Sequence, residues 1–257
     1  MPTVDLAHDD AGDGPAVVLI HGHPFNRSMW APQLAALQDR FRVIVPDLRG
    51  YGDSPVTPGT VTMAQLAADV SHLLDRKGIT TAALAGLSMG GLVAMELAAA
   101  QPERWRAYGF IATTAQRLTG EERAARLASA RTMEEQGMRP VAEQMAARLF
   151  GPEPSAELTQ HIMAMMLATS PAGAAAAVRG RAERPDYQPV LKSLTAPALV
   201  CAGDRDSYST AEITAELAGC LRAPEVVILD GVGHLPNLER PDDFNEHLLR
   251  FLGRALP

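Results

Sequence analysis

The segment from Leu84 to Gly91 constrains the fold of this chain more than any other part of its sequence. An apolar run over residues 82–87 ends in the pattern Gly-Leu-Ser-Met-Gly, and good helix formers follow it. This order predicts a buried strand, a sharp turn and a helix. Glycines beside the turn permit a close backbone approach that a side chain would block. Ser88, whose hydroxyl such a turn exposes at the end of a sheet, is therefore the first candidate nucleophile.

Short apolar runs alternate with amphipathic segments before residue 115 and again after residue 197. This alternation predicts an α/β fold with a largely parallel sheet and helices on both of its faces. Thr62 and Gln65 form a capping-box pattern at the start of one predicted helix, and its buried face carries Leu66, Val70, Leu73 and Leu74. The predicted strands cover residues 16–21, 41–46, 82–87, 108–112, 198–202 and 226–229.

The alternation stops between residues 117 and 188, where the sequence predicts helices and no strand. We therefore predict an α/β core made of residues 1–115 and 190–257, with a helical insertion over residues 116–189 after the fourth long strand. Nine arginines, no lysine and nine acidic residues lie between 117 and 188, so this insertion is near neutral. The predicted helices cover residues 120–136, 140–150, 155–169 and 171–182, separated by prolines.

Charge and cysteine content narrow the class of protein. The 257 residues carry a formal net charge of −7 and no basic block, which argues against nucleic acid and anionic membrane surfaces as partners. Cys201 and Cys220 are predicted to be reduced thiols rather than a disulfide. The first residues lack the pattern of a signal peptide, and no apolar run approaches membrane-spanning length. We expect a cytoplasmic protein.

A serine nucleophile requires a general base, and the base requires an acid that orients it. The last two predicted strands each end in suitable residues. Asp204 and Asp206 follow the strand over 198–202, and His234 follows the strand over 226–229. The chain order serine, aspartate, histidine is that of the α/β-hydrolases.

With these motifs the chain resembles the α/β-hydrolase fold superfamily, and it is most similar to the branch of small bacterial esterases, enol-lactone hydrolases and cofactor-free haloperoxidases. The resemblance implies a mostly parallel central sheet flanked by helices, with the insertion forming a cap. It rests on the Ser88 motif together with His21-Gly22-His23-Pro24, Pro46 to Ser54, Gly203 to Asp206 and Gly233 to Pro241.

The resemblance also implies the roles of individual residues. The acid of the family usually stands fourth in a Gly-x-x-Asp pattern, which selects Asp206 over Asp204, and the base is His234. The backbone N–H groups of His23 and Met89 are expected to form an oxyanion hole. The His23 side chain either lines the pocket or packs against its loop. The loop from Asp47 to Ser54 is expected to support the fold rather than to catalyse.

The predicted function is that of a serine hydrolase, a carboxylesterase that acts on small esters through an acyl-enzyme. No cofactor and no metal are implied, and the expected partner is a small ester or lactone. Enol-lactone hydrolysis, C–C bond hydrolysis and perhydrolysis with the same triad remain open, as does a non-catalytic ligand receptor on the same fold. Six methionines of the insertion are expected to pack the cap, with one or two lining the pocket: Met133, Met138, Met145, Met163, Met165 and Met166.

Overall fold

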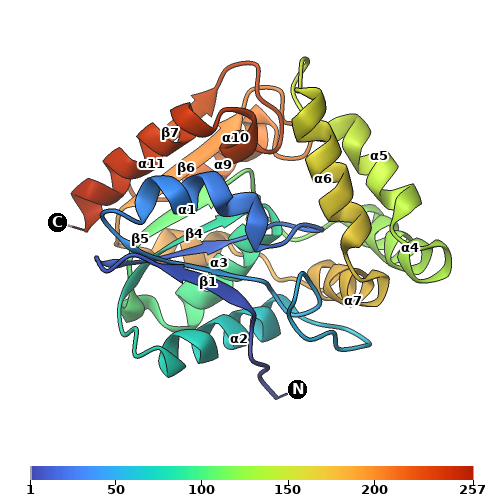
Figure 1. The fold of residues 1–257 in the computed structure, drawn as a ribbon, viewed down its shortest axis with the longest axis horizontal. Coiled ribbons are helices and arrows are strands. Elements are labelled where there is room, and N and C mark those ends of the chain that lie inside the picture. The colour runs from blue at the N-terminus through green and yellow to red at the C-terminus, as the bar shows by residue number, and fades with distance from the viewer. Residues whose placement is uncertain (1, 257) are drawn as a thin grey trace.

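A computed structural model describes residues 2–256, which form one seven-stranded sheet in the order β1-β3-β2-β4-β5-β6-β7 (Figure 1). Strand β1 runs antiparallel to β3, and all other neighbours are parallel. The mostly parallel sheet predicted from the alternation is therefore confirmed. The strands are β1 (His8–Ala11), β2 (Ala16–Ile20), β3 (Arg42–Pro46), β4 (Ala82–Leu87), β5 (Trp105–Ile111), β6 (Ala198–Gly203) and β7 (Glu225–Leu229).

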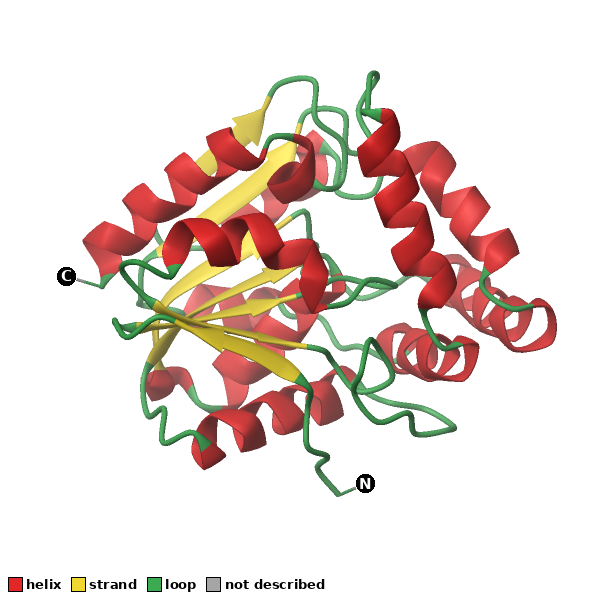
Figure 2. Ribbon diagram, in the orientation of Figure 1, coloured by secondary structure: helices red, strands yellow, loops and turns green. Residues whose placement is uncertain are grey.

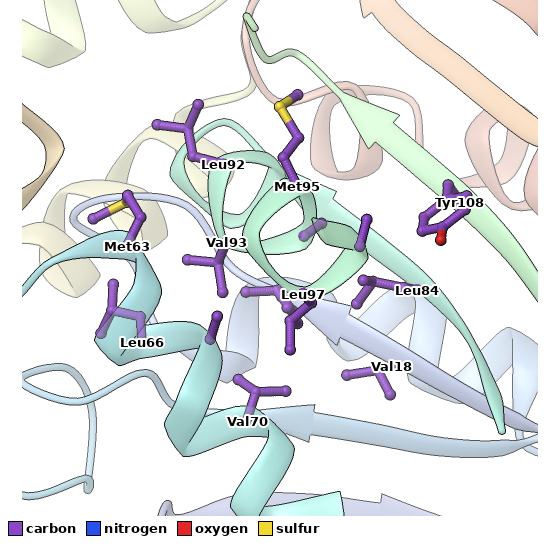
Figure 3. Close-up of a cluster of buried hydrophobic side chains, with 14 of the residues drawn as sticks. Val18, Met63, Leu66, Val70, Leu84, Leu92, Val93, Met95, Leu97 and Tyr108 are labelled. Atoms are coloured by element: carbon purple, nitrogen blue, oxygen red, sulfur yellow. The ribbon is translucent and has the colours of Figure 1, made fainter. Parts of the chain in front are cut away.

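Helices cover both faces of the sheet because alternate strand residues point to opposite sides. In β2, Val18 and Ile20 belong to one buried cluster, whereas Val17 and Leu19 belong to another. Figure 3 shows part of the first cluster, where α2 and α3 pack over Val18 and Leu84. The first face carries α2 (Met63–Arg76), α3 (Met89–Ala100), α8 (Gln188–Ser193) and α9 (Ala211–Gly219), and the second carries α1 (Ala31–Leu37) and α11 (Pro241–Ala255).

The capping box predicted at the start of α2 is present. The Gln65 N–H donates to Thr62 Oγ1 at 3.2 Å, and the Thr62 N–H donates to Gln65 Oε1 at 2.8 Å. Two of the N–H groups that the first helical turn leaves without helical acceptors are thereby satisfied. The predicted apolar face, Leu66, Val70, Leu73 and Leu74, is buried.

Four helices, α4 to α7, occupy residues 120–182 between β5 and α8, where the sequence predicts helices. They lie together on one side of the sheet (Figure 2), with α5 packed against both α4 and α6. We call α4 to α7 the helical segment. Its members are α4 (Gly120–Gln136), α5 (Arg139–Leu149), α6 (Ala156–Ala168) and α7 (Pro171–Ala182).

Several short elements were not expected from the sequence. Strand β1 has no apolar alternation and forms by pairing with β3, while Asp10 makes ion pairs with Arg42 and Lys77, each at 2.8 Å. Long-range pairing, rather than local pattern, therefore decides this strand. The other unexpected elements are α1, α8, the short helix α10 (Pro236–Glu239) and the 3₁₀ turns η1 (Arg27–Trp30) and η2 (Pro102–Arg104).

Two further sequence expectations concern the cysteines and possible membrane spans. Cys201 and Cys220 are both free thiols, and burial raises the pKa of Cys201 to about 12. Within the described chain, no single helix is long and apolar enough to cross a membrane. Helices α6 and α7 meet the length and composition requirement only as a pair, across a bend of 91°.

Candidate active site

Ser88 lies in the sharp turn between β4 and α3, in the strand-turn-helix setting that the sequence predicts. Its φ of 54° and ψ of −110° are rarely adopted by residues other than glycine. The turn is possible because glycines, which have no side chain, stand two residues before and two residues after Ser88. A Cβ on Gly86 would lie 2.2 Å from the Gly90 carbonyl oxygen, and one on Gly90 would lie 2.2 Å from the Ile20 carbonyl oxygen. The local backbone thus depends on both glycines.

Hydrogen bonds to neighbouring strands hold the Ser88 backbone in place. Its N–H donates to the Ile111 carbonyl oxygen at 2.8 Å, and its own carbonyl oxygen accepts from Thr113 Oγ1 at 2.7 Å. The Ser88 backbone is therefore fixed by β5 and by Thr113, two residues after β5, and its side-chain hydroxyl is left available at the strand end.

Asp206 and His234 meet at the ends of β6 and β7. His234 Nδ1 lies 2.8 Å from Asp206 Oδ2, and both side chains are buried. Because an ionised carboxylate only accepts hydrogen bonds, this contact places the proton of the neutral imidazole on Nδ1 and leaves Nε2 as an acceptor. The imidazole is therefore oriented as a general base requires.

The environment of Asp206 favours its ionised form. Burial alone would raise the pKa of this carboxyl, but His234 and the backbone N–H groups of Ser209 and Tyr208 outweigh it and lower the pKa. Asp206 Oδ1 accepts from those two N–H groups at 3.0 and 2.7 Å. Asp204 is exposed, pairs with Arg205 at 3.1 Å and accepts from the Val232 N–H at 3.3 Å. Only Asp206 of the two aspartates contacts His234.

Glu239, in α10, holds the loop that carries His234. Its carboxylate accepts from the N–H groups of Gly233 and Leu235, each at 3.1 Å. It also accepts from the Gly151 N–H at 2.7 Å, and the His234 N–H donates to the Leu149 carbonyl oxygen at 2.7 Å. The position of the His234 loop thus depends partly on the C-terminal end of α5, in the helical segment.

His23 lies on the other side of the turn, in the loop after β2. A Cβ on Gly22 would lie 3.4 Å from the Ser88 Cβ, so this loop runs directly beside the serine. His23 Nδ1 lies 2.8 Å from the Tyr51 hydroxyl, and the pKa of His23 is well below that of a free histidine, mainly because of burial and also because of Arg181 and Arg126. Met89 is the first residue of α3, whose first N–H groups have no acceptor within the helix.

Ser88, His23 and His234 line one cavity of about 650 Å³. Its walls come from the strand ends on one side and from the helical segment on the other. Of the six methionines in the insertion, Met145 lines this cavity, while Met133, Met138, Met165 and Met166 are buried in packing. The expectation that most pack and one or two line the pocket agrees with this arrangement.

The loop from Asp47 to Ser54 is held in place by polar contacts within it and with neighbouring elements. Asp47 is buried, forms an ion pair with Arg27 and accepts from the Asp53 N–H at 2.9 Å. Arg49 forms a buried ion pair with Asp69 at 2.6 Å. These contacts support the structural role that the sequence resemblance implies for this loop.

Several contacts at the site were not expected from the sequence. Tyr208 packs beside His234 with ring centroids 5.0 Å apart. Its position two residues after Asp206 is the only feature of the sequence that indicates a place near the site. Tyr51 and Glu239 lie within two of the motifs named above, but their contacts with His23 and with the His234 loop were not expected, and the arginines of the helical segment belong to no motif. Within residues 2–256, no group of three or more His, Cys, Asp or Glu side chains is arranged to hold a metal ion.

Comparison with known proteins agrees with this fold. The chain is 35% identical over 236 residues to 3-oxoadipate enol-lactonase 2 of Acinetobacter baylyi, which covers 91% of this chain and 86% of the relative. A thermophilic esterase from Thermogutta terrifontis, solved with malate bound, superposes with a TM-score of 0.96 at 36% identity, covering 98% of this chain and 94% of the esterase. The enol-lactonase from Burkholderia xenovorans LB400 superposes with a TM-score of 0.87 at 31% identity, covering 96% of both chains. Residues 17–247 match the model of the alpha/beta hydrolase family, and the chain therefore belongs to that family.

Proposed function

We propose that this protein is a serine hydrolase that cleaves small carboxylic esters through an acyl-enzyme, with Ser88 as nucleophile, His234 as base and Asp206 as the acid. The observation that carries the proposal is the shared cavity. Ser88, in a strained turn, and His234, bound through Nδ1 to a buried carboxylate, both open onto it. A strained serine, an oriented imidazole and a buried acid are the parts that acyl transfer needs.

In this mechanism Ser88 Oγ attacks the ester carbonyl while His234 Nε2 takes its proton. The tetrahedral intermediate carries its negative charge on the former carbonyl oxygen, where the N–H groups of His23 and Met89 donate hydrogen bonds. His234 then returns the proton to the leaving alcohol. A water molecule, deprotonated by His234, cleaves the acyl-enzyme and releases the acid and Ser88.

The helical segment acts in this proposal as a cap, which the sequence places over residues 116–189. Side chains of α4, α5 and α7 form the cavity wall that faces the strand ends. The exclusion of water from a site strengthens the electrostatic interactions inside it. A cap that excludes water therefore favours the charged transition state.

Enol-lactone hydrolysis is the second candidate, and the names of two relatives favour it. The relative at 35% identity and the solved structure at 31% identity are both enol-lactonases. A lactone is an internal ester, so the same residues act in the same steps. Comparing kcat/KM for an enol-lactone and for open-chain esters of similar size separates the two activities.

Replacing the nucleophile tests the mechanism directly. Ser88→Ala should lower kcat for a p-nitrophenyl ester by about 10⁵- to 10⁶-fold, the scale seen when a catalytic serine is removed. Fluorophosphonate labelling of wild-type protein should be lost in the same variant. Residual turnover of more than about one part in a thousand would contradict the assignment. Labelling of Ser88 without turnover of any ester or lactone would favour a ligand receptor on this fold.

A further inference from the structure

The cavity wall contributed by the helical segment and the residues around it is strongly cationic. Five arginines and one carboxylate from residues 116–189 line the cavity that also contains Ser88 and His234. The sequence has equal numbers of basic and acidic residues between 117 and 188, so the excess of arginines on the cavity wall arises from the folding of this segment and not from its composition. The lining arginines are Arg117, Arg126, Arg148, Arg181 and Arg184, and the carboxylate is Glu122.

Arg181, in α7, has no partner for its charge among the described residues. Its Nε is buried without a hydrogen-bond acceptor. Burial of the guanidinium, and next the charges of Arg126 and Arg184 that face it, hold the pKa of Arg181 well below its ordinary value. A guanidinium stays protonated in proteins, so Arg181 remains a cation that is partly removed from water and has no anion beside it.

Arg126, in α4, shares this setting. Burial lowers the pKa of Arg126, and the acid that opposes this effect, Glu122, acts through its charge and not through a hydrogen bond. Two of the other lining arginines, Arg184 and Arg148, make hydrogen bonds. Arg184 donates from Nε and Nη2 to the Gln116 carbonyl oxygen at 3.2 and 2.9 Å. Arg148 donates to the Ser207 carbonyl oxygen and lies over the Tyr208 ring, 5.0 Å from its centroid.

Glu122, the one acid of the lining, is engaged at the start of α4. Its Oε2 accepts from the Thr119 N–H at 2.8 Å, which is half of a capping box, and this hydrogen bond lowers the pKa of Glu122. Among the described residues, Glu122 forms no hydrogen bond or ion pair with Arg126 or Arg181. The cavity therefore keeps an excess of positive charge beside the nucleophile.

We infer that Arg181 and Arg126 bind a carboxylate carried by the substrate itself, so that the preferred substrate is an ester or lactone with a free acid group. The inference rests on the proposed function and specifies its substrate class. An arginine fork recognises a carboxylate through two parallel hydrogen bonds, and such charge-assisted bonds are about twice as strong as neutral ones. Hydrolysis of such a substrate adds water across the acyl C–O bond and yields an alcohol, or an enol for an enol-lactone, and an acid; when the free carboxylate lies on the acyl side, that acid is a dicarboxylate.

The test compares matched charged and neutral esters. We expect wild-type kcat/KM to be at least about 10-fold higher for the mono-p-nitrophenyl ester of adipic acid than for p-nitrophenyl hexanoate, which has the same chain length without the second carboxylate. Arg181→Gln and Arg126→Gln should each lower this charged-to-neutral ratio by about 10- to 100-fold, as expected for the loss of hydrogen bonds to a charged group. Arg181→Lys should recover part of the ratio, because it restores the charge without the fork.

Arg179 provides the matched control on the same helix. It lies two positions before Arg181, forms an ion pair with Glu134 and donates to the Gly59 carbonyl oxygen at 3.2 Å, outside the cavity. Arg179→Gln removes one positive charge from α7, so a ratio that falls equally in this variant would show a nonspecific effect of net charge and would overturn the inference. A wild-type ratio near one would also overturn it.

A binding measurement separates failure of the inference from failure of the proposed function. Adipate should raise the thermal midpoint of Ser88→Ala protein in a concentration-dependent way, and Arg181→Gln in that background should abolish most of the shift. Inorganic phosphate at equal concentration should give a smaller shift. If no ester is hydrolysed but adipate binds through Arg181, the proposed function fails and the anion site stands. If phosphate stabilises as well as adipate, or if adipate gives no shift, the carboxylate site is overturned.

Discussion

Arg49 in the α/β core is buried and Arg181 in the helical segment is half-buried, and their surroundings differ completely. Arg49 donates from Nε and Nη2 to the two carboxylate oxygens of Asp69 at 2.7 and 2.6 Å, and it also donates to the Pro2 carbonyl oxygen. Arg181 faces two further arginines and no acid. A charge that is partly withdrawn from water without a partner destabilises a fold, so we expect Arg181 to contribute to ligand binding rather than to stability.

The same contrast separates the two walls of the cavity. On the strand-end wall, both carboxylate oxygens of Asp206 accept hydrogen bonds, from His234 and from two backbone N–H groups. On the wall of the helical segment, the polar groups of Arg181 and Arg126 are left for a ligand. We therefore expect the strand-end wall to carry the catalytic residues and the wall of the helical segment to bind the substrate carboxylate. The predictions below test this difference between the two walls.

The largest effect is expected on the strand-end wall. Asp206→Asn should lower kcat by about 10⁴-fold, because the amide can no longer favour the Nδ1–H tautomer of His234 or stabilise the imidazolium. The measurement is kcat for a neutral p-nitrophenyl ester. Asp204→Asn is the matched control, since Asp204 is exposed and paired with Arg205. Loss of activity in Asp204→Asn comparable to that in Asp206→Asn would break the assignment of the acid.

The second prediction compares how replacing Arg49 and replacing Arg181 change the free energy of unfolding. Arg49→Met should lower the free energy of unfolding by about 3–5 kcal/mol, because it leaves Asp69 buried without its cation. Arg181→Met should leave the free energy of unfolding unchanged or raise it, because it removes a charge that no acid balances. Urea denaturation of both variants is the measurement. Equal destabilisation by the two replacements would mean that Arg181 has a protein partner after all.

The smallest effect concerns pH and the buried histidines. Burial lowers the pKa of His21 and, aided by Arg181 and Arg126, holds the pKa of His23 well below that of a free histidine. The unfolded chain binds protons at both positions near pH ~6.5 while the folded chain does not, so stability is complete above that pH and is lost as the pH falls below it.

His23→Gln should therefore reduce the slope of unfolding free energy against pH, between pH 5 and 6, by up to about 1.4 kcal/mol per pH unit. Urea denaturation at a series of pH values measures the slope. His161→Gln, on the exposed part of α6, controls for the loss of one imidazole. An unchanged slope in His23→Gln would mean that His23 is protonated in the folded protein, which would conflict with a cationic cavity wall beside it.

Local patterns in the sequence predict much of this fold. The apolar run before Ser88, the capping box at Thr62 and the spacing of Leu66 and Val70 each act over a few residues, and the structure has the corresponding elements at those places. Strand β1 was missed because its four residues carry no apolar alternation and it exists only through pairing with β3. Signals of that kind are not contained in a short window of sequence.

The candidate catalytic residues were proposed from the sequence, because Ser88, His234, Asp204 and Asp206 follow strands whose ends share one edge of a parallel sheet, and the family resemblance selected Asp206. The sequence by itself thus determined the strand-turn-helix at Ser88 and the order of the three residues. Tertiary structure alone decided how the charges of the near-neutral insertion are distributed. Glu122 is held by the start of its own helix, while Arg126 and Arg181, 55 positions apart, come to one wall without an acid between them. Charge balance along a chain does not predict charge balance in space, because each side chain takes its partners from whatever the packing of helices brings within a few ångströms.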